Sequence, residues 1–161
     1  MSAITVQNVA ELKNKATEIL SRYSIDIMRV SLGLVFICFG VLKFIPGASP
    51  AAALAVETIE KLTFGIVSGD AALLLTAAME TFIGLTLVSG KLLKTGLVVL
   101  AVALVGIMSP LVISFGELFP TGTPTLAAQY VFKDIVLAAA GLVIGAKALG
   151  ARFVPSATKV A

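Results

Sequence analysis

Glu80 is an acidic residue in the middle of an apolar run, TAAMETFIG, about nine residues from each end of segment 71–89. A charged carboxylate at the centre of a bilayer costs on the order of 3 kcal/mol unless it is protonated or paired. A buried carboxylate can also take and give protons during catalysis. We therefore expect Glu80 to be a proton carrier. The alternative is a protonated Glu80 that only hydrogen-bonds between helices.

Lys43 stands near the end of another apolar run, in the sequence FGVLKFIP. Its ammonium group either snorkels out to the membrane interface or turns inward to a carboxylate. A later run supplies one, in YVFKDIVL, where Lys133 and Asp134 are adjacent. Neighbouring helical residues point about 100° apart, so we expect Asp134 to face inward and Lys133 to face the interface. These three residues would then meet Glu80 in the outer half of one bundle and bind a ligand there.

Arg29 lies close to the start of the first apolar run. Basic residues at the ends of membrane spans usually reach the headgroups, so we expect Arg29 to anchor the span. We also count Arg29 among the candidate ligand-binding residues, with Lys43, Lys133 and Asp134.

The absence of histidine and the single cysteine limit the possible chemistry. Without imidazole, the chain cannot form a His-ligated haem or metal site. Cys38 alone cannot form an intrachain disulfide, and we expect it to act as a small apolar residue. We therefore predict no haem or metal bound by this chain alone, so redox chemistry would need a quinone or a partner subunit.

Four apolar runs must position these residues, at about 27–45, 71–89, 96–115 and 130–149. Hydrophobic residues make up 58% of the 161 residues and charged residues only 13%, which is typical of a membrane protein. Each run is about 19 or 20 residues long, enough to cross the hydrocarbon core as a helix. The predicted fold class is therefore all-α, a four-helix transmembrane bundle.

The segment before the first run, within 1–26, has apolar residues at helical spacing and charged residues mostly elsewhere. This pattern predicts an amphipathic helix on the cytoplasmic membrane surface. The alternative is an ordinary helix that packs beneath the bundle. The predicted organisation is this helix, a membrane domain over 27–149 and a cytoplasmic tail over 150–161.

The first loop contains a short predicted helix, over 51–64, that we expect to form a structured lid. Ser49 is its expected N-cap, Pro50 its first residue and Gly65 its C-cap.

Three other local patterns concern the later part of the chain. We expect the Pro- and Gly-containing segment 116–129 to be a loop. Pro110 should kink the third run and free a backbone carbonyl. Gly141 and Gly145 form a small-xxx-small pattern that either supports close helix contact or arises by chance.

The distribution of Lys and Arg predicts the orientation. Nine of the twelve cations fall on the side of the two termini, and three, Lys43, Lys61 and Lys133, fall on the other. Because cytoplasmic loops carry the excess of cations, both termini are expected in the cytoplasm. The net charge of +3 gives no indication of nucleic-acid binding.

Three segments, RVSLGLVFICFGVLKF, METFIGLTLVSGKLLKTG and YVFKDIVLAAAGLVIGAK, resemble the DoxX-like family, closest to its YkgB/RclC-like branch in the bacterial inner membrane. The resemblance covers about 27–149. The family hallmarks fall on Arg29, Gly40, Lys43, Phe44, Glu80, Gly84, Gly90, Lys133 and Asp134.

The resemblance implies a four-helix bundle, and in some members a link to quinone-dependent oxidation or to complexes that handle oxidative stress. Two functional hypotheses follow. The protein is a redox- or quinone-linked membrane subunit, or it is a non-catalytic accessory subunit of a larger respiratory or stress-response complex. A homo-oligomer is a further possible assembly, and whether the chain is an enzyme stays open. A transporter is less favoured, because we see no inverted repeat and few polar residues that could line a pore.

Overall fold

The computed structural model describes residues 3–152, and over this range the chain forms helices and no strand. Three stretches are long and apolar enough to cross a membrane: Glu11–Lys43, Gly69–Ser89 and Leu93–Ile113. The structure thereby confirms the predicted all-α fold class and the prediction of membrane-spanning helices, with three candidate spans. Most of the predicted C-terminal tail, 153–161, lies outside the described residues.

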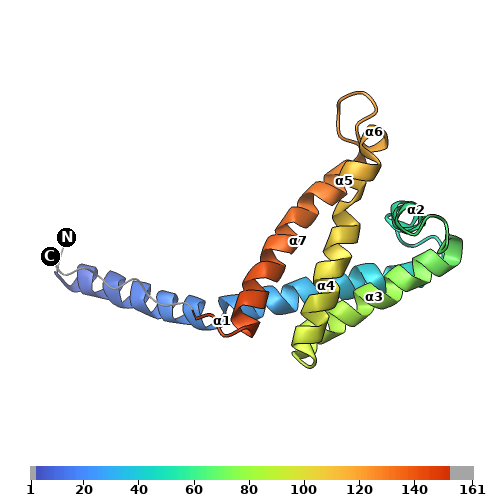
Figure 1. Ribbon diagram of the computed structural model, residues 1–161. Helices are drawn as coiled ribbons and strands as arrows, with labels where there is room; N and C mark the ends of the chain where they lie inside the picture. The colour runs from blue at the N-terminus through green and yellow to red at the C-terminus, as the bar shows by residue number, and fades with distance from the viewer. Residues whose placement is uncertain (1–2, 153–161) are drawn as a thin grey trace.

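The first helix, α1, runs unbroken over Ala3–Lys43. The predicted boundary near residue 26 is therefore absent, because the chain contains no glycine or proline before Gly33 that would end the helix. The N-terminal part of α1 extends away from the other helices (Figure 1). Its described side chains over 8–24 are exposed, which contradicts packing beneath a bundle.

Helix α3, Gly69–Ser89, packs along α1 through glycines. A Cβ atom added to Gly84 would lie 2.6 Å from the Gly33 carbonyl oxygen, and one added to Gly40 would lie 2.8 Å from the Thr81 nitrogen. The two backbones approach too closely for any side chain at these positions. At Gly145, by contrast, a Cβ would meet nothing within 4 Å, so the close helix contact that was one of the two interpretations of GLVIG does not form there.

Proline 110 divides the third apolar run into α4, Leu93–Met108, and α5, Pro110–Ile113. Pro110 has no N–H for the Gly106 carbonyl, and this oxygen accepts instead from the Ser109 N–H at 3.1 Å and from the Ser109 hydroxyl at 2.7 Å. The run is thus interrupted at Ser109 and Pro110, but the carbonyl expected to be free is bonded to Ser109, and the kink stays a prediction.

The predicted loop 116–129 is partly helical. It contains most of α6, Phe115–Leu118, and the start of α7, Leu126–Ala148. Thr125 is the N-cap of α7, and its hydroxyl accepts a hydrogen bond from the Ala128 nitrogen.

The short helix predicted in the first loop is confirmed as α2, Ala52–Leu62. Gly65 follows it in the left-handed conformation, with a φ of +80°, as a C-terminal glycine should. The predicted N-cap was wrong. Ser49 makes no capping bond, and its buried hydroxyl has no partner among the described residues.

The helices form two antiparallel pairs, α1 with α3 and α4 with α7, which diverge toward the side where α2 lies (Figure 1). The pairs meet in a buried apolar core at the closed end of this wedge, formed by Ile25, Leu32, Phe36, Ile83, Leu87, Leu100, Ala103 and Ile144. The open end, between the pairs and α2, contains the candidate site.

Candidate functional site

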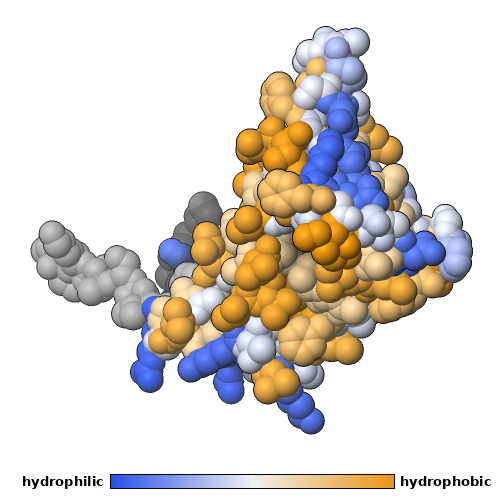
Figure 2. All heavy atoms as spheres, turned by 45° about the vertical axis from the view of Figure 1, so that its right-hand side comes forward, coloured by the Kyte–Doolittle hydropathy of each residue, from blue (hydrophilic) through white to orange (hydrophobic). Residues whose placement is uncertain are grey.

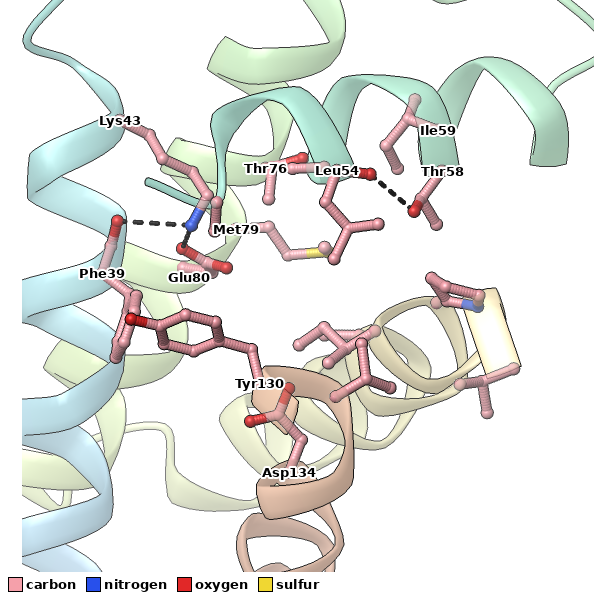
Figure 3. Close-up of a pocket in the computed structure, with 18 of the residues that line it drawn as sticks. Phe39, Lys43, Leu54, Thr58, Ile59, Thr76, Met79, Glu80, Tyr130 and Asp134 are labelled. Atoms are coloured by element: carbon pink, nitrogen blue, oxygen red, sulfur yellow. Dashed lines mark hydrogen bonds and ion pairs between the residues drawn. The ribbon is translucent and has the colours of Figure 1, made fainter. Parts of the chain in front are cut away.

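A cavity of about 460 Å³ fills the open end of the wedge (Figure 3). Helices α1 to α5 and α7 all line it, and most of the lining is apolar. Its polar and charged lining residues are Lys43, Thr58, Thr63, Thr76, Glu80, Tyr130, Lys133 and Asp134. This composition, apolar walls with a few polar groups, is typical of small-molecule sites.

Lys43 and Glu80 form a buried ion pair at one wall of the cavity. The Lys43 Nζ lies 2.6 Å from the Glu80 Oε2, and the side chains are 2% and 8% exposed. The ammonium group also donates to the Phe39 carbonyl oxygen at 3.4 Å. Lys43 therefore turns inward, which is one of its two expected orientations. Gly40, one turn before Lys43, lets α3 approach at Thr81 and so brings Glu80 within reach.

Asp134 and Lys133 both line the cavity, whereas the sequence predicts that only Asp134 faces inward and that Lys133 faces the interface. Asp134 is half-buried and points into the cavity (Figure 3), without an ion pair to any described residue. Lys133 is exposed, and its ammonium lies 3.8 Å from the centre of the Tyr130 ring and 5.9 Å from that of Phe39. Such distances allow cation–π attraction, so Lys133 holds the two rings at the edge of the cavity.

Arg29 lies at the closed end and does not belong to this site, contrary to its place among the candidate ligand-binding residues. Its guanidinium donates to the Leu87 and Val88 carbonyls at the C-terminus of α3. Cations at this end of a helix stabilise its unpaired carbonyls and dipole. Arg29 is separated from Lys43 by roughly 21 Å along α1, at 1.5 Å per residue.

Asp26 links Arg29 to the last helix. Its carboxylate lies 3.7 Å from the Arg29 Nε and accepts a hydrogen bond from Lys147 at 2.8 Å. This network ties together α1, α3 and α7 at the closed end.

A further polar cluster, which the sequence did not predict, joins α2 to the segment around α6. The Lys61 Nζ donates to Glu57 at 2.5 Å, to Ser114 at 2.8 Å and to Glu117 at 3.0 Å, while the Ser114 hydroxyl donates to Glu57 at 3.1 Å. We call these four residues the α2 latch. Figure 2 shows a hydrophilic strip on an otherwise largely apolar face beside α2. The spacing of Glu57 and Lys61 predicts their own pairing, but not the contact with α6.

The α2 latch has a defined pH dependence. The hydrogen bond from Lys61 is the main cause that lowers the pKa of Glu57 below its usual 4.5, and the hydrogen bond to Glu57 is the main cause that raises the pKa of Lys61 above 10.5. A lowered carboxyl pKa contributes stability above pH 4.5 that is lost as the pH falls through the folded value. A raised amine pKa contributes stability below pH 10.5 that is lost as the pH rises.

We therefore expect α2 to become more mobile below about pH 4.5, since Glu57 loses its charge opposite Lys61. A spin label at Ala53→Cys in a Cys38→Ala background reports this mobility, because Ala53 is an exposed α2 residue. The same label in a Glu57→Gln chain should show a smaller acid transition. Equal mobility at pH 6 and pH 3 would contradict the assignment.

Comparison with protein-family models, curated proteins and solved structures finds no match to this chain. Within residues 3–152, no three His, Cys, Asp or Glu side chains lie close enough together to hold a metal ion.

Proposed function

We propose that this protein binds a lipid-soluble molecule with a polar head group, of the quinone class, as a subunit of a redox-linked membrane system. The observation that carries the proposal is the buried Lys43–Glu80 pair on the wall of an apolar cavity. Charged groups at this depth are costly, and they commonly mark ligand or proton pathways. The cavity volume lies in the usual range for small-molecule sites, about 300 to 1,000 Å³.

The cavity residues suit such a head group. The Lys43 ammonium is a hydrogen-bond donor for a carbonyl oxygen, and Glu80 and Asp134 are carboxyl groups that can exchange protons. A quinone takes up two electrons and two protons when it is reduced. The chain supplies groups for the protons, and the electrons come from a partner subunit in this proposal. The apolar walls leave room for the start of a hydrophobic tail.

We also propose that α7 is a fourth span and that the protein lies in the bacterial cytoplasmic membrane with both termini in the cytoplasm. The contact of Lys147 with Asp26 supports this topology, because the basic C-terminus of α7 lies at the same end as Arg29. The cavity then opens in the outer half of the membrane. The resemblance to the DoxX-like family agrees with this arrangement.

A second candidate function is that of an accessory subunit. The exposed N-terminal part of α1 favours it, because Val9, Leu12, Ile19 and Leu20 are all more than half exposed. In this case the extension would contact a larger membrane complex, and the Lys43–Glu80 pair would only fix helix packing. Co-purification from mild detergent, with and without residues 1–20, separates the two candidates. Loss of a stable partner on truncation supports the accessory role.

Ligand binding is tested by calorimetric titration of a short-chain ubiquinone into the purified protein in nanodiscs. We expect saturable binding to the wild type and about 10- to 100-fold weaker binding to Glu80→Gln. This is the usual cost of removing a charged group from a hydrogen-bonding network. Asp70→Asn is the matched control, since Asp70 is an exposed acid at the start of the same helix. Absence of wild-type binding, or equal affinity for Glu80→Gln, would contradict the proposal.

A further inference from the structure

Helix α2 forms one wall of the cavity with its inner face. α2 contributes Leu54, Ala55, Thr58, Ile59 and Leu62, and the residues that flank it contribute Ala51 and Thr63; most of these are apolar (Figure 3). The Thr58 hydroxyl donates to the Leu54 carbonyl of its own helix at 2.6 Å. Among the described residues, the Thr58 side chain therefore makes no hydrogen bond to another helix.

The side-chain hydrogen bonds that fasten α2 lie on its other faces. The α2 latch connects it to Ser114 and Glu117, and the Glu60 carboxylate accepts a hydrogen bond from the Gly69 nitrogen at 2.9 Å. The side chains of Lys61, Glu57 and Glu117 are 36%, 38% and 63% exposed. When these bonds break, water can replace them, because the charged groups already face solvent or headgroups.

The segments on both sides of α2 make few packing contacts. Gly47 and Gly65 have φ angles of +74° and +80°, and a Cβ at either position would meet nothing within 4 Å. Phe64 and Ile66 are 94% and 85% exposed. Glycines in open turns can change their backbone angles without steric conflict, so these segments are suited to act as hinges.

We propose that α2 is a gate over the cavity and that the α2 latch controls its opening. With the latch formed, the apolar face of α2 closes the wedge between the helix pairs. When Lys61 releases Ser114 and Glu117, α2 turns on its hinges as a unit and opens a path between the cavity and the surroundings. The gate acts on whatever molecule the cavity holds, so it does not depend on the quinone assignment.

The gate is tested by the rate at which a thiol inside the cavity reacts with a water-soluble maleimide. Thr76→Cys in a Cys38→Ala background is the probe, because Thr76 is buried, lines the cavity and is close in size to cysteine. We expect Lys61→Met to raise the labelling rate by about fivefold or more, as expected for breaking a network of exposed ion pairs. Glu117→Gln removes the negative charge of one partner of Lys61 and should give a smaller increase.

Lys94→Met is the matched control, since Lys94 is an exposed lysine in α4 that makes no ion pair with the described residues. It should leave the rate unchanged. Circular dichroism establishes whether each variant is folded. If Lys61→Met is not folded, Glu117→Gln takes its place as the latch variant. Equal labelling of the folded latch variant and the parent, or equal acceleration by Lys94→Met, would overturn the gate. Ligand affinity does not enter this measurement, so its result is independent of the proposed function.

Discussion

Lys43→Met is expected to lower the free energy of unfolding by about 3 to 5 kcal/mol, which is the usual cost of leaving one member of a buried ion pair without its partner. Glu80 would then have to remain charged in a buried site or take up a proton. Both side chains are almost fully buried, so neither water nor headgroups can replace the lost contact. Reversible denaturation in detergent, followed by circular dichroism, measures the loss.

The double variant Lys43→Met/Glu80→Gln separates the pair from the rest of the site. Removing both charges should recover much of the lost stability, because apolar or neutral groups often replace a buried pair at little cost. The surface variant Lys94→Met should change the unfolding free energy by at most about 0.5 kcal/mol. If Lys43→Met lowers the free energy of unfolding by no more than Lys94→Met does, the Lys43–Glu80 pair does not form. The same conclusion follows if the loss in the double variant equals the sum of the losses in Lys43→Met and Glu80→Gln.

Gly84→Val is expected to have the second largest effect, a loss of about 3 kcal/mol, at the upper end of the range for overpacked sites. The added side chain would meet the Gly33 carbonyl and the Ile37 nitrogen, at 2.6 and 2.7 Å from the new Cβ. These are backbone atoms, so α1 and α3 would have to move apart. The separation would also withdraw Glu80 from Lys43, and ligand binding should fall with stability. Thermal unfolding in detergent measures the stability, and calorimetry measures the ligand affinity.

Gly145→Ala is the control for this variant, since a Cβ at Gly145 meets nothing within 4 Å. Alanine is about 1 kcal/mol more favourable than glycine in a helix interior. The control should therefore be unchanged or more stable. Equal melting temperatures for Gly84→Val and the wild type would contradict the close packing of α1 and α3.

The helices of this fold could be predicted from the sequence because each depends on a local property. Run length and hydropathy placed the apolar segments, and Pro110 marked the boundary between α4 and α5. The continuity of α1 was missed because a change from polar to apolar composition was taken as a boundary, although no helix breaker stands there. The glycine pair that actually forms a contact, Gly33 with Gly84, could not be chosen over Gly141 and Gly145. That choice depends on which helix faces which.

The candidate site was only partly predictable, for the same reason. The unfavourable position of Glu80 in an apolar run indicated a partner. Helical geometry indicated that Asp134 faces inward, but Lys133, which was expected at the interface, lines the cavity as well. Arg29 carried the same signal as Lys43, a cation near the end of a run, yet it caps α3 at the opposite end. The α2 latch joins residues more than fifty positions apart in the chain, and nothing local relates Lys61 to Ser114.

Photolabelling with an azido-quinone shows whether the cavity beside the Lys43–Glu80 pair is a ligand site. The protein is labelled in nanodiscs, with and without excess short-chain ubiquinone, and the modified peptides are mapped by mass spectrometry. Competed labelling is expected on cavity residues of α1, α3 and α7, such as Phe39, Met79 and Tyr130, and it should be lost in Glu80→Gln. Labelling spread over the exposed apolar surface, unaffected by competitor or by Glu80→Gln, would contradict the assignment of a ligand site.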